Sequence, residues 1–133
     1  MRAEDGLHNF RNALERFSIM IDRKQDILED GYGDIYLDLA VKRFEFTYEM
    51  AWKAIKRYVE FLGLVCRSPR ECIMEAYAQS MIEDESVWLD MIEMRNITAH
   101  TYDEVEMSGL LDKLADYQTA FSQLEKFIGK ELQ

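Results

Sequence analysis

Proline and glycine are scarce in this sequence, which has one Pro and six Gly among 133 residues. An all-β domain needs a turn signal about every 8–12 residues, so the scarcity argues against a sheet protein. The chain also lacks any apolar run near the roughly 18 residues of a membrane span. Its charged start contains no apolar signal-peptide core. We therefore expect neither a membrane segment nor a targeting signal.

Cysteine is nearly absent as well. Cys66 and Cys72 flank Pro69 and form neither a C-x-x-C pair nor a four-ligand metal set. A disulfide framework would need more cysteines, so the sequence predicts two plain thiols and a cytoplasmic protein. One histidine among scattered carboxylates has no metal-ligand spacing, so no metal site and no cofactor are expected.

Positive charge is in deficit: 16 Lys and Arg stand against 26 Asp and Glu, and 16 − 26 = −10. A general nucleic-acid coat would carry a basic patch, so this balance disfavours one, although it leaves room for one small RNA-contacting site. The apolar fraction of 48% is enough for one core. We expect a single domain over residues 1–133.

What the sequence does contain is helical periodicity. A first helix is predicted over 3–29, with apolar residues advancing by 3 or 4. The turn 30–33 contains two glycines, and Asp34 is predicted to cap a second helix that runs to Leu62, with Gly63 at its C′ position. Its 29 residues would span roughly 43 Å, which predicts an elongated bundle.

The second half of the chain shows three further helix signals. Ser68 and Glu71 predict a capping box for a third helix that ends near Gln79. The acidic run 83–85 suits the start of a fourth helix. Thr101 and Glu104 predict a second capping box for the last helix, with a bend at Gly109. The predicted fold is all-α: an antiparallel up-and-down four-helix bundle with an extra short helix, four to five helices in all.

Candidate chemistry gathers in residues 94–103, which hold Arg95, Asn96, His100 and Tyr102. On an unbroken helix Arg95 and His100 differ by about 140°, so their convergence needs the helix to end near Ala99 or needs a second copy of the chain. The structural alternative is a helix end with Arg95 paired to a neighbouring carboxylate, at position 93 or 103.

Two motifs carry a family resemblance. The run Arg95-Asn96-x-x-x-His100-x-Tyr102 resembles the R-x4-H-x-Y motif of HEPN domains, specifically the HepT-like branch, also described as nucleotidyltransferase substrate-binding proteins. The segment 44–53 resembles the F-E-x-x-[FY]-E-x-x-W-K signature of that branch's long helix. Chain length and helical layout agree with this family over nearly the whole chain.

The resemblance implies a two-gene toxin–antitoxin module in which this chain, as a homodimer, cuts RNA without metal and pairs with a cognate minimal nucleotidyltransferase. Arg95 would stabilise phosphate charge in the transition state, His100 would move a proton at the ribose 2′-OH, and Asn96 would orient the histidine or the phosphate. Tyr102 would receive AMP from the transferase. The alternative is a non-catalytic partner that presents substrate to the transferase or is its substrate.

Charge around the motif opposes RNA binding. Between residues 83 and 106 eight carboxylates surround Arg95, at positions 83, 84, 85, 90, 93, 103, 104 and 106. Lys42, Lys53 and Lys56 fall on one side of the second helix and offer an RNA track, and the alternative is solvated surface with an ordinary Glu49–Lys53 pair. Trp52, Trp88 and the eight methionines are predicted to lie in the core or in a dimer interface.

Overall fold

The protein is built from four long helices and short helical segments between them. The computed structural model describes residues 2–100 and 103–133, and no strand occurs among these residues. The all-α fold class predicted from the periodicity is confirmed. In chain order the elements are α1 (Ala3–Asp22), α2 (Lys24–Glu29), α3 (Gly33–Phe61), α4 (Pro69–Ala78), α5 (Glu85–His100), α6 (Glu104–Ser108), the 3₁₀ helix η1 (Gly109–Lys113) and α7 (Leu114–Glu131).

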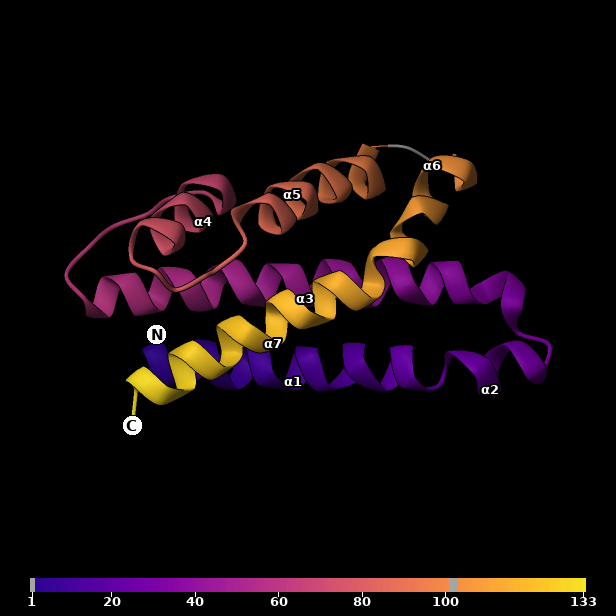
Figure 1. The fold of residues 1–133 in the computed structure, drawn as a ribbon, viewed down its shortest axis with the longest axis horizontal. Helices are drawn as coiled ribbons and strands as arrows, with labels where there is room; N and C mark the ends of the chain where they lie inside the picture. The colour runs from indigo at the N-terminus through magenta and orange to yellow at the C-terminus, as the bar shows by residue number, and fades with distance from the viewer. Residues whose placement is uncertain (1, 101–102) are drawn as a thin grey trace.

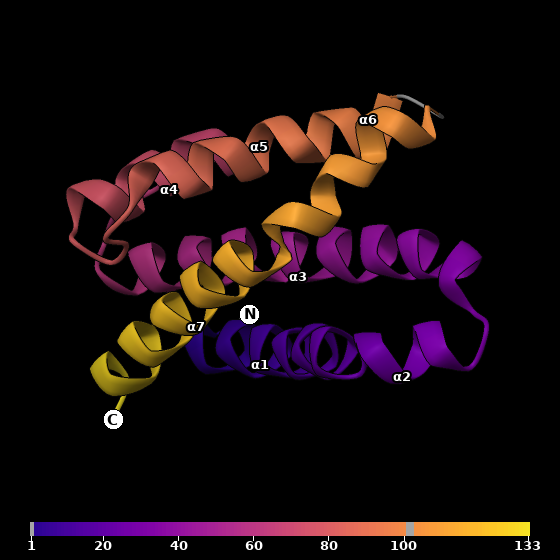
Figure 2. The same cartoon turned by 45° about the vertical axis from the view of Figure 1, so that its right-hand side comes forward.

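The long helices pack in an elongated arrangement around α3. Helix α3 lies between α1 and the α4–α5 layer, and α7 crosses α1 and α3 at an angle in both views (Figures 1 and 2). Phe121 of α7 is the centre of the core. The rings of Phe10, Phe17 and Trp88 approach it edge-on, with centroids 6.0, 5.5 and 5.6 Å away. Trp88 therefore belongs to the core, as predicted.

The predicted first helix over 3–29 is wrong in one respect, because it is divided at Arg23 (φ −98°, ψ 10°). No Pro or Gly marks this break. The apolar stripe stops with buried Met20, and no residue of α2 is buried. Since helical stability in proteins comes mostly from packing an apolar face, the segment beyond Met20 has little to keep it in line with α1.

The ends of α3 are set by glycines more than by the predicted cap. Helix α3 begins at Gly33 after Tyr32, which makes no side-chain cap, so Asp34 lies inside the first turn and the prediction of Asp34 as N-cap is wrong. Its carboxylate still suits the positive end of the helix dipole. At the other end Gly63 has φ 85°, a conformation that L side chains rarely adopt, which confirms its predicted role after the helix.

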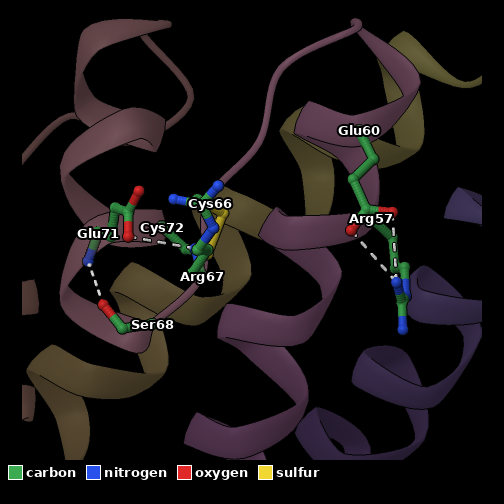
Figure 3. The surroundings of a disulfide bond; sticks show 7 residues. All are labelled: Arg57, Glu60, Cys66, Arg67, Ser68, Glu71 and Cys72. Atoms are coloured by element: carbon green, nitrogen blue, oxygen red, sulfur yellow. Dashed lines mark hydrogen bonds and ion pairs between the residues drawn. A yellow bond between two sulfur atoms is a disulfide. The ribbon is translucent and has the colours of Figure 1, made fainter.

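Helix α4 begins with the predicted cap in modified form. The Ser68 hydroxyl accepts a hydrogen bond from the Glu71 N–H at 3.1 Å, and Pro69 occupies the first turn. The Glu71 carboxylate accepts from the N–H of Arg67, one residue earlier than a capping box requires (3.3 Å; Figure 3). The start of α4 is thus fixed from both sides.

Cys66 and Cys72 form a disulfide, so the prediction of two plain thiols is wrong (Figure 3). The capped turn at Ser68 folds the chain back, which brings the two Cα atoms to 5.0 Å, within the span that a disulfide bridges. Both cysteines are fully buried. The spacing of six residues gave no sign of this pairing because it is the turn between them that creates it.

The last helix is divided too. Asp103 is the N-cap of α6, and its carboxylate accepts from the Val105 N–H at 2.9 Å. Thr101, the predicted cap, lies outside the described residues. The bend predicted at Gly109 corresponds to the change from α6 to η1. Among the helices that the structure describes, none is both long enough and apolar enough to cross a membrane.

Candidate functional site

Arg95, Asn96 and His100 line one surface cavity of about 490 Å³. Its walls come from α5, from the middle of α3 and from the start of α4. The lining residues are Tyr48, Glu49, Ser68, Pro69, Arg70, Ile92, Arg95, Asn96, Ala99 and His100. The three predicted catalytic residues inside the described part of the chain are therefore brought together.

Helix α5 positions these three side chains. It continues without a break through His100, its last residue, so the expected end before the histidine is wrong and Arg95 and His100 lie about 140° apart around the helix axis. Asn96 and His100 are one turn apart on the exposed side of α5, whereas Arg95 is half-buried. Arg95 thus forms the inner part of the cavity wall and His100 its solvent-facing edge.

Arg95 is anchored by α3. Its guanidinium donates to Glu45 Oε2 at 2.9 Å, and the Thr98 hydroxyl donates to the same oxygen at 2.9 Å. The alternatives expected at positions 93 and 103 do not include this pairing, which joins Arg95 to Glu45 across 50 residues of sequence. A carboxylate that binds one edge of the guanidinium fixes its direction and leaves other N–H groups for a ligand.

Glu49, one turn further along α3, is also engaged. Its carboxylate accepts from the Trp52 indole N–H at 3.0 Å and pairs with Lys53 at 3.1 Å. Lys53 therefore makes the ordinary i, i+4 pair. Neither Lys42 nor Lys56 lines the cavity, so the structure does not join the predicted lysine track to the site.

Tyr48 is buried and lines the cavity together with Arg95. Burial and the charge of Glu49 raise the pKa of Tyr48 to about 12, against the opposing charges of Arg95 and Arg70. The hydroxyl is therefore protonated at neutral pH and available as a donor to whatever occupies the cavity.

The acidic residues around the motif lie mostly elsewhere. Glu85 begins α5 ten residues before Arg95 (95 − 85 = 10), about 15 Å away along the axis, beyond the roughly 8 Å screening length at physiological salt. Asp90 is bonded to Lys113 and Tyr117. Among the described residues that line the cavity, Glu49 is the one carboxylate, against Arg70 and Arg95. Because Glu45 pairs with Arg95, the four charges balance, and the cavity presents two guanidinium groups without a net positive charge.

Sequence reasoning missed two parts of this site. Glu45 lies in the quoted α3 signature but was given no role, because its contact with Arg95 spans 50 residues. Arg70 could not be assigned to the site, because the capping signal at Ser68 predicts where α4 begins but not which helix the start of α4 packs against. Tyr102, the predicted modification site, lies outside the described residues. Among the described residues no group of three or more His, Cys, Asp or Glu could hold a metal ion.

The all-helical bundle is the fold that the HepT-like resemblance implied. The family model described as "Nucleotidyltransferase substrate binding protein like" matches residues 5–130. The chain therefore belongs to this family, and the predicted HepT-like membership is confirmed.

Individual relatives agree. The chain is 30% identical over 112 residues to a Haemophilus influenzae protein named "Probable ribonuclease HepT", covering 79% of this chain and 77% of the relative. A Haemophilus influenzae structure described as the fold of a substrate-binding domain of a nucleotidyltransferase aligns with TM-score 0.72 and 23% identity, over 90% of this chain and 98% of that chain. A Thermus thermophilus structure aligns with TM-score 0.68 and 29% identity, over 95% and 98%.

Proposed function

We propose that this protein is a metal-independent endoribonuclease, the toxin of a two-gene module. The observation that carries the proposal is that Arg95, Asn96 and His100 line one surface cavity. Family membership and the ribonuclease name of a relative support the same activity. We propose the cytoplasm as its compartment. The free thiols expected from the sequence no longer support this compartment, because Cys66 and Cys72 form a disulfide and disulfides are rare in the cytoplasm.

In the proposed reaction the ribose 2′-oxygen attacks the adjacent phosphorus and the bond from phosphorus to the 5′-oxygen breaks. The imidazole of His100 takes the proton of the 2′-hydroxyl, since histidine ionises nearest to neutral pH. The leaving 5′-oxygen takes up a proton from solvent or from a second copy of the chain. Arg95, held in place by Glu45, stabilises the charge that grows on the phosphoryl oxygens. Asn96, one turn before His100, orients the imidazole or the phosphate.

Cleavage of RNA by the purified protein tests this proposal. His100→Ala should lower the rate by about 10²–10⁴-fold, the usual cost of removing a positioned acid–base group. Arg95→Ala should lower it by about 10²–10³-fold, the usual cost of removing a group that stabilises charge in the transition state. Chelation with EDTA should leave the rate unchanged. His8→Ala is the matched control, because His8 is an exposed histidine on α1 bonded to Asn12, away from the cavity. Equal rates for wild type and His100→Ala would overturn the assignment.

A second candidate function is a non-catalytic subunit that serves a separate nucleotidyltransferase. The net charge of −10 and the description of the structural neighbour as a substrate-binding domain favour it. Incubation with the cognate minimal nucleotidyltransferase, Mg²⁺ and ATP separates the two. We expect a mass gain of AMP that Tyr102→Phe abolishes, and RNA cleavage that stops once the protein is modified. AMP transfer to a protein that never cuts RNA would support the second function.

A further inference from the structure

Arg70 faces the same cavity as Arg95 from another wall. It lies in the first turn of α4, whose start is fixed by the hydrogen bonds at Ser68 and by the disulfide that encloses it. Among the described residues none pairs with the Arg70 guanidinium, whereas Arg95 is held by Glu45. Arg70 is thus a cation on a fixed backbone whose guanidinium is available to bind an anion.

Arg70 and Arg95 line the same cavity. The charges of both act against the raised pKa of Tyr48, which also lines the cavity, so each charge lies near this residue. Ser68 and Pro69 complete the wall that carries Arg70, and α5 supplies Asn96 and Arg95 to another wall. Arg95 already has Glu45 as a partner, so Arg70 is the cation that needs an anionic ligand, and a chain of phosphates can meet both guanidinium groups at once.

We propose that Arg70 binds a phosphate of the RNA backbone next to the phosphate held by Arg95. This inference rests on the proposed ribonuclease function and names a binding residue outside the Arg95–Tyr102 motif. It assigns the cavity to a polynucleotide, because a chain of phosphates offers an anionic group to each of the two arginines. Arg70 contributes to binding and not to bond cleavage, so its removal should raise KM and leave kcat nearly unchanged.

The role of Arg70 is tested by measuring how wild type and variants bind a single-stranded 2′-fluoro RNA. This RNA lacks the attacking hydroxyl and is therefore not cut. Fluorescence anisotropy over a series of KCl concentrations gives both affinity and salt dependence. Arg70→Gln should weaken binding about tenfold, the loss of one charge-assisted contact. It should also reduce the slope of log K against log[salt] by about 0.7, the value for one phosphate contact on a single strand.

Two further variants keep the result interpretable. Arg70→Lys retains the charge but not the planar fork, so it should restore the salt slope and recover only part of the affinity. Arg67→Gln is the matched control, because Arg67 is exposed, lies three residues earlier and does not line the cavity. It should bind like the wild type.

The outcomes separate the two proposals. If wild type binds the RNA and Arg70→Gln keeps its affinity and slope, or loses no more than Arg67→Gln, the inference about Arg70 is overturned while the ribonuclease function stands. If wild type neither binds this RNA nor cuts ordinary RNA, the proposed function fails and the inference fails with it.

Discussion

The hydroxyl of Tyr117 links α7 to α5 through Asp90. It donates to Asp90 Oδ2 at 2.5 Å, and Lys113 donates to Oδ1 at 2.9 Å. Burial alone would raise the pKa of Asp90, but the bonds from Tyr117 and Lys113 outweigh it and lower that pKa below 3.8. Burial and the Asp90 charge raise the pKa of Tyr117. The pair is therefore a neutral phenol bonded to an ionised carboxylate.

We predict that Tyr117→Phe lowers the free energy of unfolding at neutral pH by about 1.5–3 kcal/mol, the range for a hydrogen bond to a charged group. Because the folded pKa of Asp90 is depressed, this stability is present above the unfolded value of 3.8 and is lost as pH falls through the folded pKa. Urea denaturation at neutral pH and below pH 3.8 measures both. A difference between wild type and variant that is the same at both pH values would contradict the charged-acceptor interpretation.

At the residue scale the sequence predicted what lies close in the chain and missed what lies far apart. Arg95, Asn96 and His100 could be selected because one motif contains them. Glu45 and Arg70 could not be placed, because their proximity to Arg95 is created by the packing of α3 and α4 against α5. A periodic pattern shows which face of a helix is buried and does not show which helix covers it.

At the scale of elements, the segment between α3 and α4 depends on the Cys66–Cys72 disulfide. It contains the exposed apolar residues Leu64 and Val65 and leads directly into the cavity wall at Ser68–Arg70. A segment with so little buried surface gains its order from Gly63, from the Ser68 cap and from the disulfide. The order of this segment therefore depends in part on whether the two cysteine sulfur atoms are oxidised.

We predict that reducing the disulfide lowers the free energy of unfolding by about 2 kcal/mol, the chain-entropy value for so short a loop. Thermal melts with and without dithiothreitol measure the change. The double variant Cys66→Ala/Cys72→Ala is the control, since its melting temperature should not respond to the reductant. A wild-type melt that is equally unresponsive would show that no disulfide is present.

Helix boundaries could be predicted where their cause lies in neighbouring residues and not where it lies in the packing of the core. Gly63 and Ser68 could be predicted because a positive φ and a helix N-cap are properties of a few neighbouring residues. The break at Arg23 could not, because it follows from where the core ends and not from a breaker residue. The turn before α3 could be predicted from its glycines, but the first helical residue could not, because no side chain caps the helix.

At the scale of the whole molecule, we predict a homodimer. One chain supplies one Arg95 and one His100 to an open cavity on its surface, and a two-fold pairing of the α5 ends would place two such sets in one groove. Light scattering coupled to size exclusion should give a mass near twice 15.8 kDa. A monomer at tens of micromolar would contradict the prediction.

Helix α3 has a further consequence for how this protein can evolve. Its middle supplies the core residues Phe44, Tyr48 and Ala51, of which Tyr48 also lines the cavity. Next to Phe44 it supplies Glu45, which holds Arg95. A substitution there that alters the site also disturbs packing, so such changes are removed by selection for stability before their effect on substrate choice is tested. The start of α4 carries Arg70 on an exposed, covalently fixed turn, where a side chain can be exchanged without disturbing the core. New substrate preferences should therefore arise first at α4, while α3 preserves the chemistry.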